Sequence, residues 1–249
     1  MSYLKGVYWD LDGTIANTEL EAHLPAFNKS FAELGLNWYW DSKTYIDLLK
    51  INGGLNRIIY YAKEENKNIS KDFATIIHKK KQFFYLKLID EGAVSLKEGV
   101  LRLTSELTKK KVRQFIVTSS SRIQVDLLIK NLFKDYNPFE FCITSEDVDY
   151  LKPNPFPYLK AINLSKINEN NSIVFEDSNP GLISSSKAKL PTICVSSNIP
   201  ISYEKGLDLK CIISSLGEIN NPSNIILGPE LKKDIIDYYY LDNFLQGFN

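Results

Sequence analysis

Short apolar runs recur along the chain, and each ends in polar residues. Residues 4–9 form such a run, which stops at Asp10, and residues 112–118 and 172–176 repeat the pattern. Buried β-strands have this length and composition. These runs therefore predict strands of one sheet, with polar side chains gathered where the strands end.

Beyond Gly99 the predicted strands alternate with helices. We expect helices at about 99–110, 122–133, 154–163 and 179–188, and further strands at 140–143, 191–195 and 210–213. Such alternation is typical of a parallel sheet joined by right-handed crossovers. The pattern therefore predicts an α/β fold with a Rossmann-like parallel sheet as its core.

Residues 17–95 break this alternation. Their apolar residues recur at helical spacing, as at Phe27 and Phe31. We expect an all-helical cap domain over 17–95, inserted into an α/β core domain made of 1–16 and 96–249. Because the insertion follows the first polar cluster directly, it is expected to act as a lid over a site.

The pattern after Ser223 is weaker. Leu231, Ile235, Ile236 and Tyr239 have the spacing of one amphipathic helical segment. The aromatic run Tyr238-Tyr239-Tyr240 is expected to pack on the core or on a partner.

Composition limits the class of partner. The 249 residues include 30 basic and 30 acidic side chains, so the net charge is zero. Without a positive field, nucleic acid and anionic membranes are not expected partners. The three cysteines are far apart, which fits buried thiols in a reducing compartment, and no apolar run is long enough to span a bilayer. We expect a cytoplasmic monomer that acts on a small molecule.

The polar clusters at the strand ends are expected to meet. Ligands of open parallel sheets bind beyond the carboxyl ends of the strands. The clusters are Asp10 to Thr14, Ser119 with Ser120, Lys152, and Glu176 with Asp177. Carboxylates, hydroxyls and one ammonium suit a hard cation with a phosphate, and Mg²⁺ prefers such oxygen ligands.

Each cluster also has a plainer explanation. An Asp-x-Asp pair alone favours a solvated turn, and Ser119 and Ser120 are typical helix caps. Lys152 alone is typical of a solvated surface. Acidic residues such as Glu176 and Asp177 at the end of an apolar strand are costly without a cation. The order of all the clusters along one chain favours the functional interpretation.

The chain resembles the haloacid dehalogenase superfamily of phosphotransferases, in its β-phosphoglucomutase-like branch with a helical cap. The motifs that carry the resemblance are Asp10-Leu11-Asp12-Gly13-Thr14, Ser119, Lys152-Pro153 with Pro155, and Glu176-Asp177-Ser178 with Gly181. Together they extend from residue 7 to about residue 190. The resemblance implies a magnesium-dependent phosphatase with an α/β core and a cap domain.

The same resemblance implies a role for each matched residue. Asp10 would be the nucleophile that forms an aspartyl-phosphate, and Asp12 would protonate the leaving oxygen and then activate water. Mg²⁺ would be held by Asp10, the carbonyl of Asp12 and Asp177, with Glu176 in support. Positioning and charge neutralisation of this kind dominate phosphoryl transfer.

The hydroxyls and the ammonium would bind the phosphoryl group. By the resemblance, Ser119 and Lys152 hold the group that is transferred. Ser120 is a further candidate because hydroxyls and free N–H groups before a helix can hold phosphate oxygens.

Within this branch, the insertion resembles the cap of the CbbY-type xylulose bisphosphate phosphatases. The matching positions include Thr18-Glu19, His23-Leu24-Pro25-Ala26-Phe27-Asn28, Trp40-Asp41, Tyr45, Gly53-Gly54, Arg57, and His78 with Lys81. The resemblance implies that Arg57 and Lys81 bind the phosphate that is not transferred. Glu19, His23 and Tyr45 are further candidate substrate contacts.

The predicted cap departs from its relatives at two points, and some of its candidate residues also have plainer explanations. Asn17 stands where many relatives have an acidic residue, and the spacing from Asp12 to His23 is one residue longer than in the mutase. His23 alone is typical of a helix-surface or core histidine. Arg57 and Lys81 alone are typical of solvated charges.

The leading hypothesis is a phosphatase of a small phosphorylated sugar, with a ketose bisphosphate such as xylulose 1,5-bisphosphate as substrate. One alternative is a β-phosphoglucomutase-type mutase, which transfers the same phosphoryl group to a sugar. Another is a phosphoglycolate-type phosphatase. A sensor without activity is disfavoured because no motif residue is missing.

Overall fold

The computed structural model describes residues 3–196, 207 and 209–247. The chain forms two compact units, Met1–Ala16 with Leu96–Asn249, and Asn17–Ser95. We call them the core unit and the helical unit. Among the described residues, no helix has both the length and the apolar character needed to cross a membrane.

The core unit is built on a seven-stranded sheet with the order β3-β2-β1-β4-β5-β6-β7. The strands are β1 (Gly6–Trp9), β2 (Arg113–Val117), β3 (Cys142–Ile143), β4 (Ser172–Glu176), β5 (Thr192–Val195), β6 (Cys211–Ile213) and β7 (Ile225–Leu227). Neighbours from β3 to β6 are parallel, and β7 is antiparallel to β6. The predicted α/β fold with a parallel sheet is confirmed, and the antiparallel edge strand is an addition to it.

The register of the central strands places their ends at one level. Trp9 of β1 lies opposite Ile116 of β2 and Phe175 of β4. Asp10 and Glu176 therefore follow side by side at the carboxyl edge of the sheet. All four residues of β1 are buried, because the strand is central and both sheet faces are covered.

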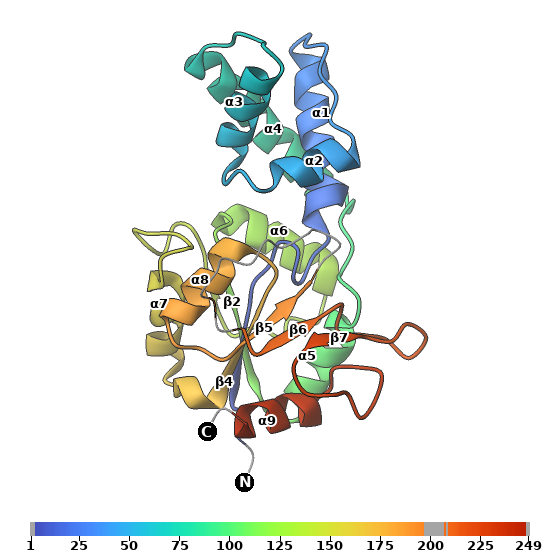
Figure 1. The fold of residues 1–249 in the computed structure, drawn as a ribbon, viewed down its shortest axis with the longest axis vertical. Helices are drawn as coiled ribbons and strands as arrows, with labels where there is room; N and C mark the ends of the chain where they lie inside the picture. The colour runs from blue at the N-terminus through green and yellow to red at the C-terminus, as the bar shows by residue number, and fades with distance from the viewer. Residues whose placement is uncertain (1–2, 197–206, 208, 248–249) are drawn as a thin grey trace. The chain divides into compact units, whose positions relative to one another are not determined.

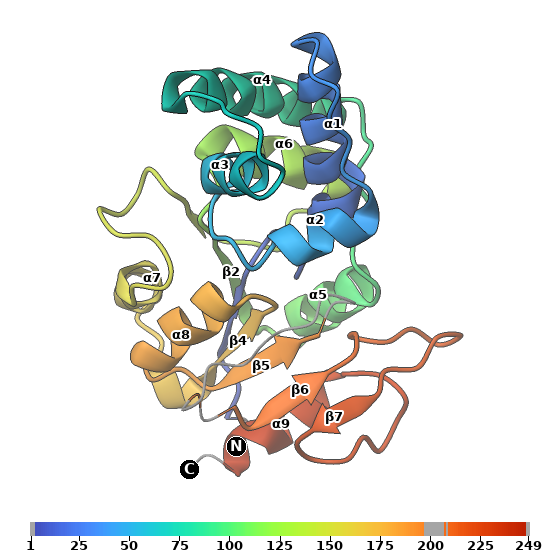
Figure 2. The same cartoon turned by 45° about the horizontal axis from the view of Figure 1, so that its top comes forward.

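Helices cover the two faces of this sheet (Figures 1 and 2). They are α5 (Val100–Lys109), α6 (Arg122–Phe133), α7 (Phe156–Ser165), α8 (Asn179–Lys187) and α9 (Tyr238–Gln246), with a short 3₁₀ turn η2 (Glu169–Asn171). Helices α7 and α8 pack together on one face, and α5 packs with α9 on the other. Tyr8, Phe115 and Val174 of the sheet form a core cluster with Tyr158 and Ala161 of α7.

The C-terminal segment differs from the expectation. The helix begins at Tyr238, where the Asp237 side chain accepts a bond from the Tyr240 N–H, so the predicted helical segment from Leu231 is wrong. The backbone of the segment before this helix bonds instead to an earlier loop, since the Ser223 N–H donates to the Asp234 carbonyl at 2.7 Å. Once those backbone groups are paired outside the segment, they are not available for a helical ladder.

The helical unit consists of five elements. They are a π-helical turn η1 (Glu19–His23) and the helices α1 (Leu24–Glu33), α2 (Ser42–Leu48), α3 (Gly54–Glu64) and α4 (Lys71–Asp90). Asp41 caps α2 and Ser70 caps α4 through their side chains. The core is rich in aromatic residues, and Trp38 and Trp40 pack within it.

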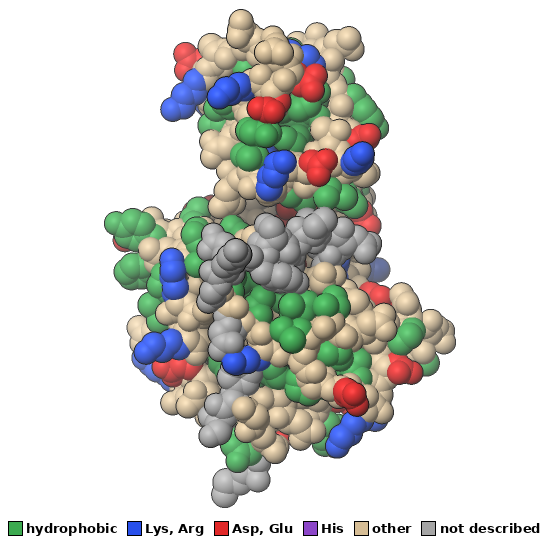
Figure 3. All heavy atoms as spheres, viewed as in Figure 1, with side chains coloured by type: hydrophobic (Ala, Val, Ile, Leu, Met, Phe, Trp, Pro, Cys, Tyr) green, Lys and Arg blue, Asp and Glu red, His purple; other side chains and the backbone are tan. Residues whose placement is uncertain are grey.

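Charges of both signs are distributed over the surface. On the face drawn in Figure 3, basic and acidic side chains are interspersed rather than gathered by sign. This agrees with the equal numbers of basic and acidic residues. An anionic ligand must therefore be bound by a few local charges.

Candidate active site

The loop after β1 turns back sharply toward the sheet edge. Gly13 has a φ of 85°, and its N–H donates to the Ala16 carbonyl at 2.8 Å. A Cβ atom on Gly13 would lie 1.9 Å from Oδ2 of Asp177, so glycine is required here. Thr14 Oγ1 also donates to Oδ1 of Asp177 at 3.3 Å. The first motif is therefore packed directly against the last one.

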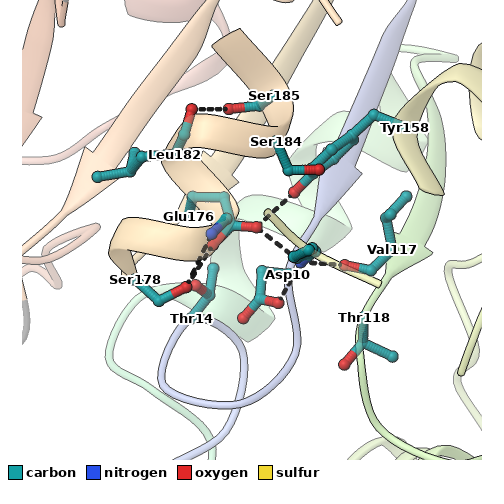
Figure 4. A network of polar contacts seen from close by, with 12 residues as sticks. Asp10, Thr14, Val117, Thr118, Tyr158, Glu176, Ser178, Leu182, Ser184 and Ser185 are labelled. Atoms are coloured by element: carbon teal, nitrogen blue, oxygen red, sulfur yellow. Dashed lines mark hydrogen bonds and ion pairs between the residues drawn. The ribbon is translucent and has the colours of Figure 1, made fainter. Parts of the chain in front are cut away.

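A buried ammonium connects three neighbouring strands at this edge. Lys152 Nζ donates to Asp10 Oδ1 and to Glu176 Oε1, each at 2.6 Å, and to the Val117 carbonyl at 2.7 Å. Figure 4 shows Asp10, Glu176 and Val117 converging from β1, β4 and β2. Only 9% of Lys152 is exposed, so the alternative of a solvated lysine is wrong.

Burial governs the protonation of this cluster. It raises the pKa of Asp10 to about 8; Lys152 opposes this rise, and the charges of Glu176 and Asp12 add to it. Burial alone would lower the pKa of Lys152, but the charges of Asp10 and Glu176 outweigh it and leave that pKa raised. The ammonium therefore remains charged, and Asp10 needs further positive charge to ionise fully.

The carboxylate of Glu176 is completely buried and bonded at both oxygens. The Tyr158 hydroxyl donates to Oε1 at 2.6 Å, and Ser178 Oγ donates to Oε2 at 3.3 Å. A Cβ atom on Gly181 would lie 1.8 Å from Oε2, so α8 can begin here only with glycine. Burial and then the charge of Glu176 raise the pKa of Tyr158 well above its ordinary value, so the phenol remains a neutral donor.

The donor set of the site fits a divalent metal ion. Among the described residues, Asp10, Glu176 and Asp177 are buried and offer oxygens within 4.8 Å of one another. Buried carboxylates this close repel one another unless a cation lies between them. A hard divalent cation accepts such oxygen ligands, and its charge would favour the ionised form of Asp10.

The side chain of Asp12 is directed to a different partner. Ser120 Oγ donates to Asp12 Oδ2 at 2.5 Å, and the Asp12 carboxylate lies outside the group of three carboxylates. The Asp12 carboxylate is therefore not grouped with the three other carboxylates. The sequence resemblance likewise assigns the backbone carbonyl of Asp12, and not its carboxylate, to the metal. The carboxylate is held by a hydroxyl and remains suited to proton transfer.

The loop after β2 contains the predicted phosphate-binding hydroxyls. Ser119 is exposed, and Ser120 N–H donates to the hydroxyl of buried Thr118 at 3.1 Å. The cap of α6 is Ser121, which exchanges reciprocal bonds with Gln124. The plainer explanation that Ser119 or Ser120 is the helix cap is therefore wrong.

In the helical unit, three of the predicted residues form one cluster. The Tyr45 hydroxyl donates to Glu19 Oε2, and Arg57 Nη1 donates to that hydroxyl at 3.4 Å. Arg57 Nε also donates to the Ile51 carbonyl at 2.9 Å, and the guanidinium carbon lies 5.8 Å from the centroid of the Tyr45 ring. The direction of the guanidinium is therefore fixed, unlike that of a freely solvated arginine.

His23 and Lys81 form a second cluster in the helical unit. Lys81 Nζ donates to His23 Nδ1 at 2.6 Å, because an ammonium has no lone pair with which to accept. The His23 ring stacks on Tyr85 at 4.1 Å, and the ammonium lies 5.1 Å from the Phe27 ring centroid. Lys81 is 3% exposed, so it is the inward-facing member of the run 79–81.

Sequence reasoning did not identify Tyr158 as part of the site. It lies on α7, six positions after Lys152, and it is fully buried. The available signal was a hydroxyl on a helix that was expected to cover the sheet. A buried hydroxyl requires a partner, and the nearest predicted acceptors were the carboxylates at the strand ends.

Comparison with known proteins establishes the family. The model of the haloacid dehalogenase-like hydrolases matches residues 7–195. This span includes the whole helical unit and the residues grouped around Lys152, which are Asp10, Val117, Tyr158, Glu176 and Asp177. The chain therefore belongs to the haloacid dehalogenase-like hydrolase family, as its motifs predicted.

Individual relatives support the same class. Protein CbbY of Rhodobacter capsulatus is 34% identical over 207 residues, which are 82% of this chain and 89% of that protein. A D10N mutant of CbbY from Rhodobacter sphaeroides, in complex with xylulose-(1,5)bisphosphate, is 27% identical with a TM-score of 0.72, covering 87% of this chain and 98% of that one. β-Phosphoglucomutase from Clostridium difficile has a TM-score of 0.69 at 18% identity and covers 98% of both chains, which shows a shared fold. The protein is a phosphatase of this hydrolase family.

Proposed function

We propose that this phosphatase is magnesium-dependent and hydrolyses a small phosphorylated sugar, with a ketose bisphosphate such as xylulose 1,5-bisphosphate as its substrate. The observation that carries the proposal is the buried ammonium of Lys152, bonded at 2.6 Å to both Asp10 and Glu176. It fixes the Asp10 carboxylate at the sheet edge beside two further carboxylates, where a metal and a phosphoryl group suit the charges.

The proposed reaction has two steps, both at phosphorus. An oxygen of Asp10 attacks phosphorus and the bond to the sugar oxygen breaks, while Asp12 gives that oxygen a proton. Asp12 then takes a proton from water as the water oxygen attacks phosphorus, which frees Asp10 and inorganic phosphate. Lys152 and Ser119 would hold the phosphoryl oxygens during both steps, while the hydroxyl of Ser120 donates to Asp12.

The proposed metal site uses Asp10, the carbonyl of Asp12 and Asp177, with Glu176 in support. When bound, Mg²⁺ supplies positive charge that offsets the carboxylates and the phosphate. The hydrogen bond from Ser120 would keep the Asp12 carboxylate turned toward the leaving oxygen rather than toward the other carboxylates.

The bisphosphate part of the proposal rests on the helical unit. Arg57 has a fixed guanidinium, and arginine binds phosphate through paired, charge-assisted bonds. Lys81 offers a second positive charge. A CbbY that is 27% identical was crystallised with a bisphosphorylated ketose. We propose that Arg57 and Lys81 bind the phosphate that stays on the sugar, with Glu19, His23 and Tyr45 near its hydroxyls.

A screen of phosphorylated metabolites tests this function. Phosphate release is measured from ketose bisphosphates, aldose monophosphates and phosphoglycolate, with Mg²⁺ and with EDTA. We expect the fastest release from a ketose bisphosphate, without a bisphosphate activator, and none in EDTA or from Asp10→Asn. Interconversion of sugar phosphates without phosphate release would instead identify a mutase. A preference for phosphoglycolate would contradict the proposed substrate, and full activity in EDTA would contradict the metal.

A further inference from the structure

Tyr158 is a buried residue of the core unit that the proposed reaction does not use. Its side chain is 0% exposed, and its hydroxyl donates to Glu176 Oε1 at 2.6 Å. In Figure 4 this hydroxyl points from α7 toward the Glu176 carboxylate. The ring belongs to the core cluster between α7 and the sheet, so its position is fixed by packing.

The hydrogen bond from Tyr158 to Glu176 also affects Asp10, because Glu176 and Asp10 share the ammonium of Lys152. Lys152 Nζ is 2.6 Å from each of the two carboxylates. Any change in how strongly Glu176 attracts Lys152 changes how the ammonium is oriented toward Asp10. The Tyr158 hydroxyl supplies a second donor to the same oxygen of Glu176 that Lys152 contacts, and it adds no charge.

The ring of Tyr158 makes a separate contact with the same lysine. The ammonium of Lys152 lies 5.2 Å from the ring centroid. A change of tyrosine to phenylalanine keeps the ring and its packing and removes the hydroxyl alone. The two contributions of Tyr158 can therefore be separated by one substitution.

We propose that Tyr158 is a positioning residue, which holds the Glu176 carboxylate and thereby sets how Lys152 is shared between Glu176 and Asp10. This inference rests on the proposed roles of Asp10 and Lys152 in phosphoryl transfer. Without the hydroxyl, Glu176 draws Lys152 toward itself, and the ammonium is displaced from the phosphoryl site. The chemical step should suffer more than substrate binding, since Tyr158 does not touch the sugar.

Tyr8 provides a matched control in the same core cluster. It is 0% exposed, and its hydroxyl bonds to Ser165 Oγ at 2.6 Å, on the same helix as Tyr158. Tyr8→Phe removes a buried phenolic hydroxyl, as Tyr158→Phe does, but its partner is a serine on α7 rather than a carboxylate of the site.

The experiment compares Tyr158→Phe with Tyr8→Phe in the full chain. Four quantities are measured: kcat and KM for the best substrate of the screen, the affinity for beryllofluoride with Mg²⁺ by calorimetry, and the unfolding midpoint in urea. Beryllofluoride serves as a phosphoryl analogue that needs no turnover. We expect Tyr158→Phe to lower kcat about tenfold and to weaken beryllofluoride binding, with KM within about twofold. Tyr8→Phe should leave kcat, KM and the beryllofluoride affinity within about twofold.

A double-mutant comparison tests whether Tyr158 acts through Glu176. In a Glu176→Gln background, Tyr158→Phe should have little further effect on kcat, because the carboxylate that it positions is gone. Equal kinetics in Tyr158→Phe and Tyr8→Phe would overturn the inference, and so would a Tyr158→Phe variant that fails to fold. If wild-type protein neither releases phosphate nor binds beryllofluoride, the proposed function fails, and this inference fails with it.

Discussion

Two buried lysines, one in each unit, differ in the partners that surround them. Lys152 is 9% exposed and bonds to the carboxylates of Asp10 and Glu176. Lys81 is 3% exposed, and its contacts include the imidazole of His23 and the ring faces of Phe27 and Tyr85. In the core unit the buried cation is compensated by opposite charge, and in the helical unit its contacts include a lone pair and aromatic rings.

The difference separates two kinds of function. A cation between carboxylates is held in place whether or not a substrate is present, which suits a group that must be oriented for chemistry. A cation held in part by an imidazole and aromatic rings, which carry no full negative charge, can still attract an arriving anion, which suits a group that selects a substrate. Substitutions in each unit test whether the two units divide the work in this way.

The largest effect is expected from Lys152→Met. Removal of the ammonium leaves Asp10 and Glu176 buried without their cation, which should cost about 3–5 kcal/mol of folding free energy. Phosphate release should fall by at least about a thousandfold, because the phosphoryl group loses its fixed positive charge. Urea unfolding at pH 7 and steady-state kinetics measure the two effects.

Lys81→Met is the matched substitution in the helical unit. Methionine is unbranched and fills apolar gaps beside aromatic rings, so the folding free energy should change by less than about 1.5 kcal/mol. A loss of stability equal to that of Lys152→Met would show that the two lysines do not differ as described.

Asp177→Ala should chiefly change the metal requirement. Asp177 is one of three buried carboxylates grouped at the sheet edge, and it also accepts a bond from Thr14. We expect the Mg²⁺ concentration for half-maximal activity to rise about a hundredfold, with activity partly recovered at high Mg²⁺. An unchanged Mg²⁺ dependence would remove Asp177 from the proposed metal site.

Arg57→Ala should change substrate preference rather than chemistry. Loss of a charge-assisted contact worth about 2 kcal/mol corresponds to a roughly thirtyfold lower kcat/KM for a bisphosphate. Hydrolysis of a small monophosphate should change far less, because that substrate lacks the second phosphate. Equal losses on both substrates would assign Arg57 to the fold or to the chemistry.

The smallest effect concerns His78 in the helical unit. Burial, with the charges of Lys81 and His23, lowers the pKa of His78 to about 4. The unfolded chain, with an ordinary pKa near 6.5, takes up the proton first as the pH falls. Stability that is complete above about pH 6.5 is therefore lost as the pH falls toward 4.

Because the His78 ring is half-buried and partly screened, its contribution should be about 1 kcal/mol. Urea unfolding at pH 7 and pH 5 measures it: the loss of stability between the two should be smaller in His78→Gln than in wild type. An identical loss in both proteins would contradict the lowered pKa.

The strand-end motifs were predictable because the carboxyl ends of parallel strands lie at one edge of the sheet. Once a parallel sheet is expected, Asp10 and Glu176 are expected at the same edge of that sheet, and the register of β1 with β4 then places them side by side. The contacts of Tyr158 and Lys81 depend on how helices pack, and no local pattern specifies that packing. Their residue types were visible in the sequence, but their partners were not.

The errors in the C-terminal region have a similar cause. Strand β7 is three residues long and lies at the sheet edge with Ile226 59% exposed, so it lacks the alternation that marks a half-buried strand. The segment from Leu231 has helical spacing, but Ile236 N–H bonds to the Leu216 carbonyl instead. The Arg102 guanidinium also donates to the carbonyls of Leu216 and Ile236. These long-range bonds override the local preference.

The most direct test of the account is to find the phosphoryl group on Asp10. Asp12→Asn should accept the phosphoryl group more slowly than wild type, because the leaving oxygen receives no proton, and should hydrolyse it more slowly still, because no base activates water. Mixing this variant with Mg²⁺ and the best substrate, quenching in acid and sequencing the peptides by mass spectrometry should locate one phosphoryl group on Asp10. Asp10→Asn treated in the same way should carry none. A phosphoryl group on another residue, or a fully active Asp12→Asn without any phospho-enzyme, would contradict the account.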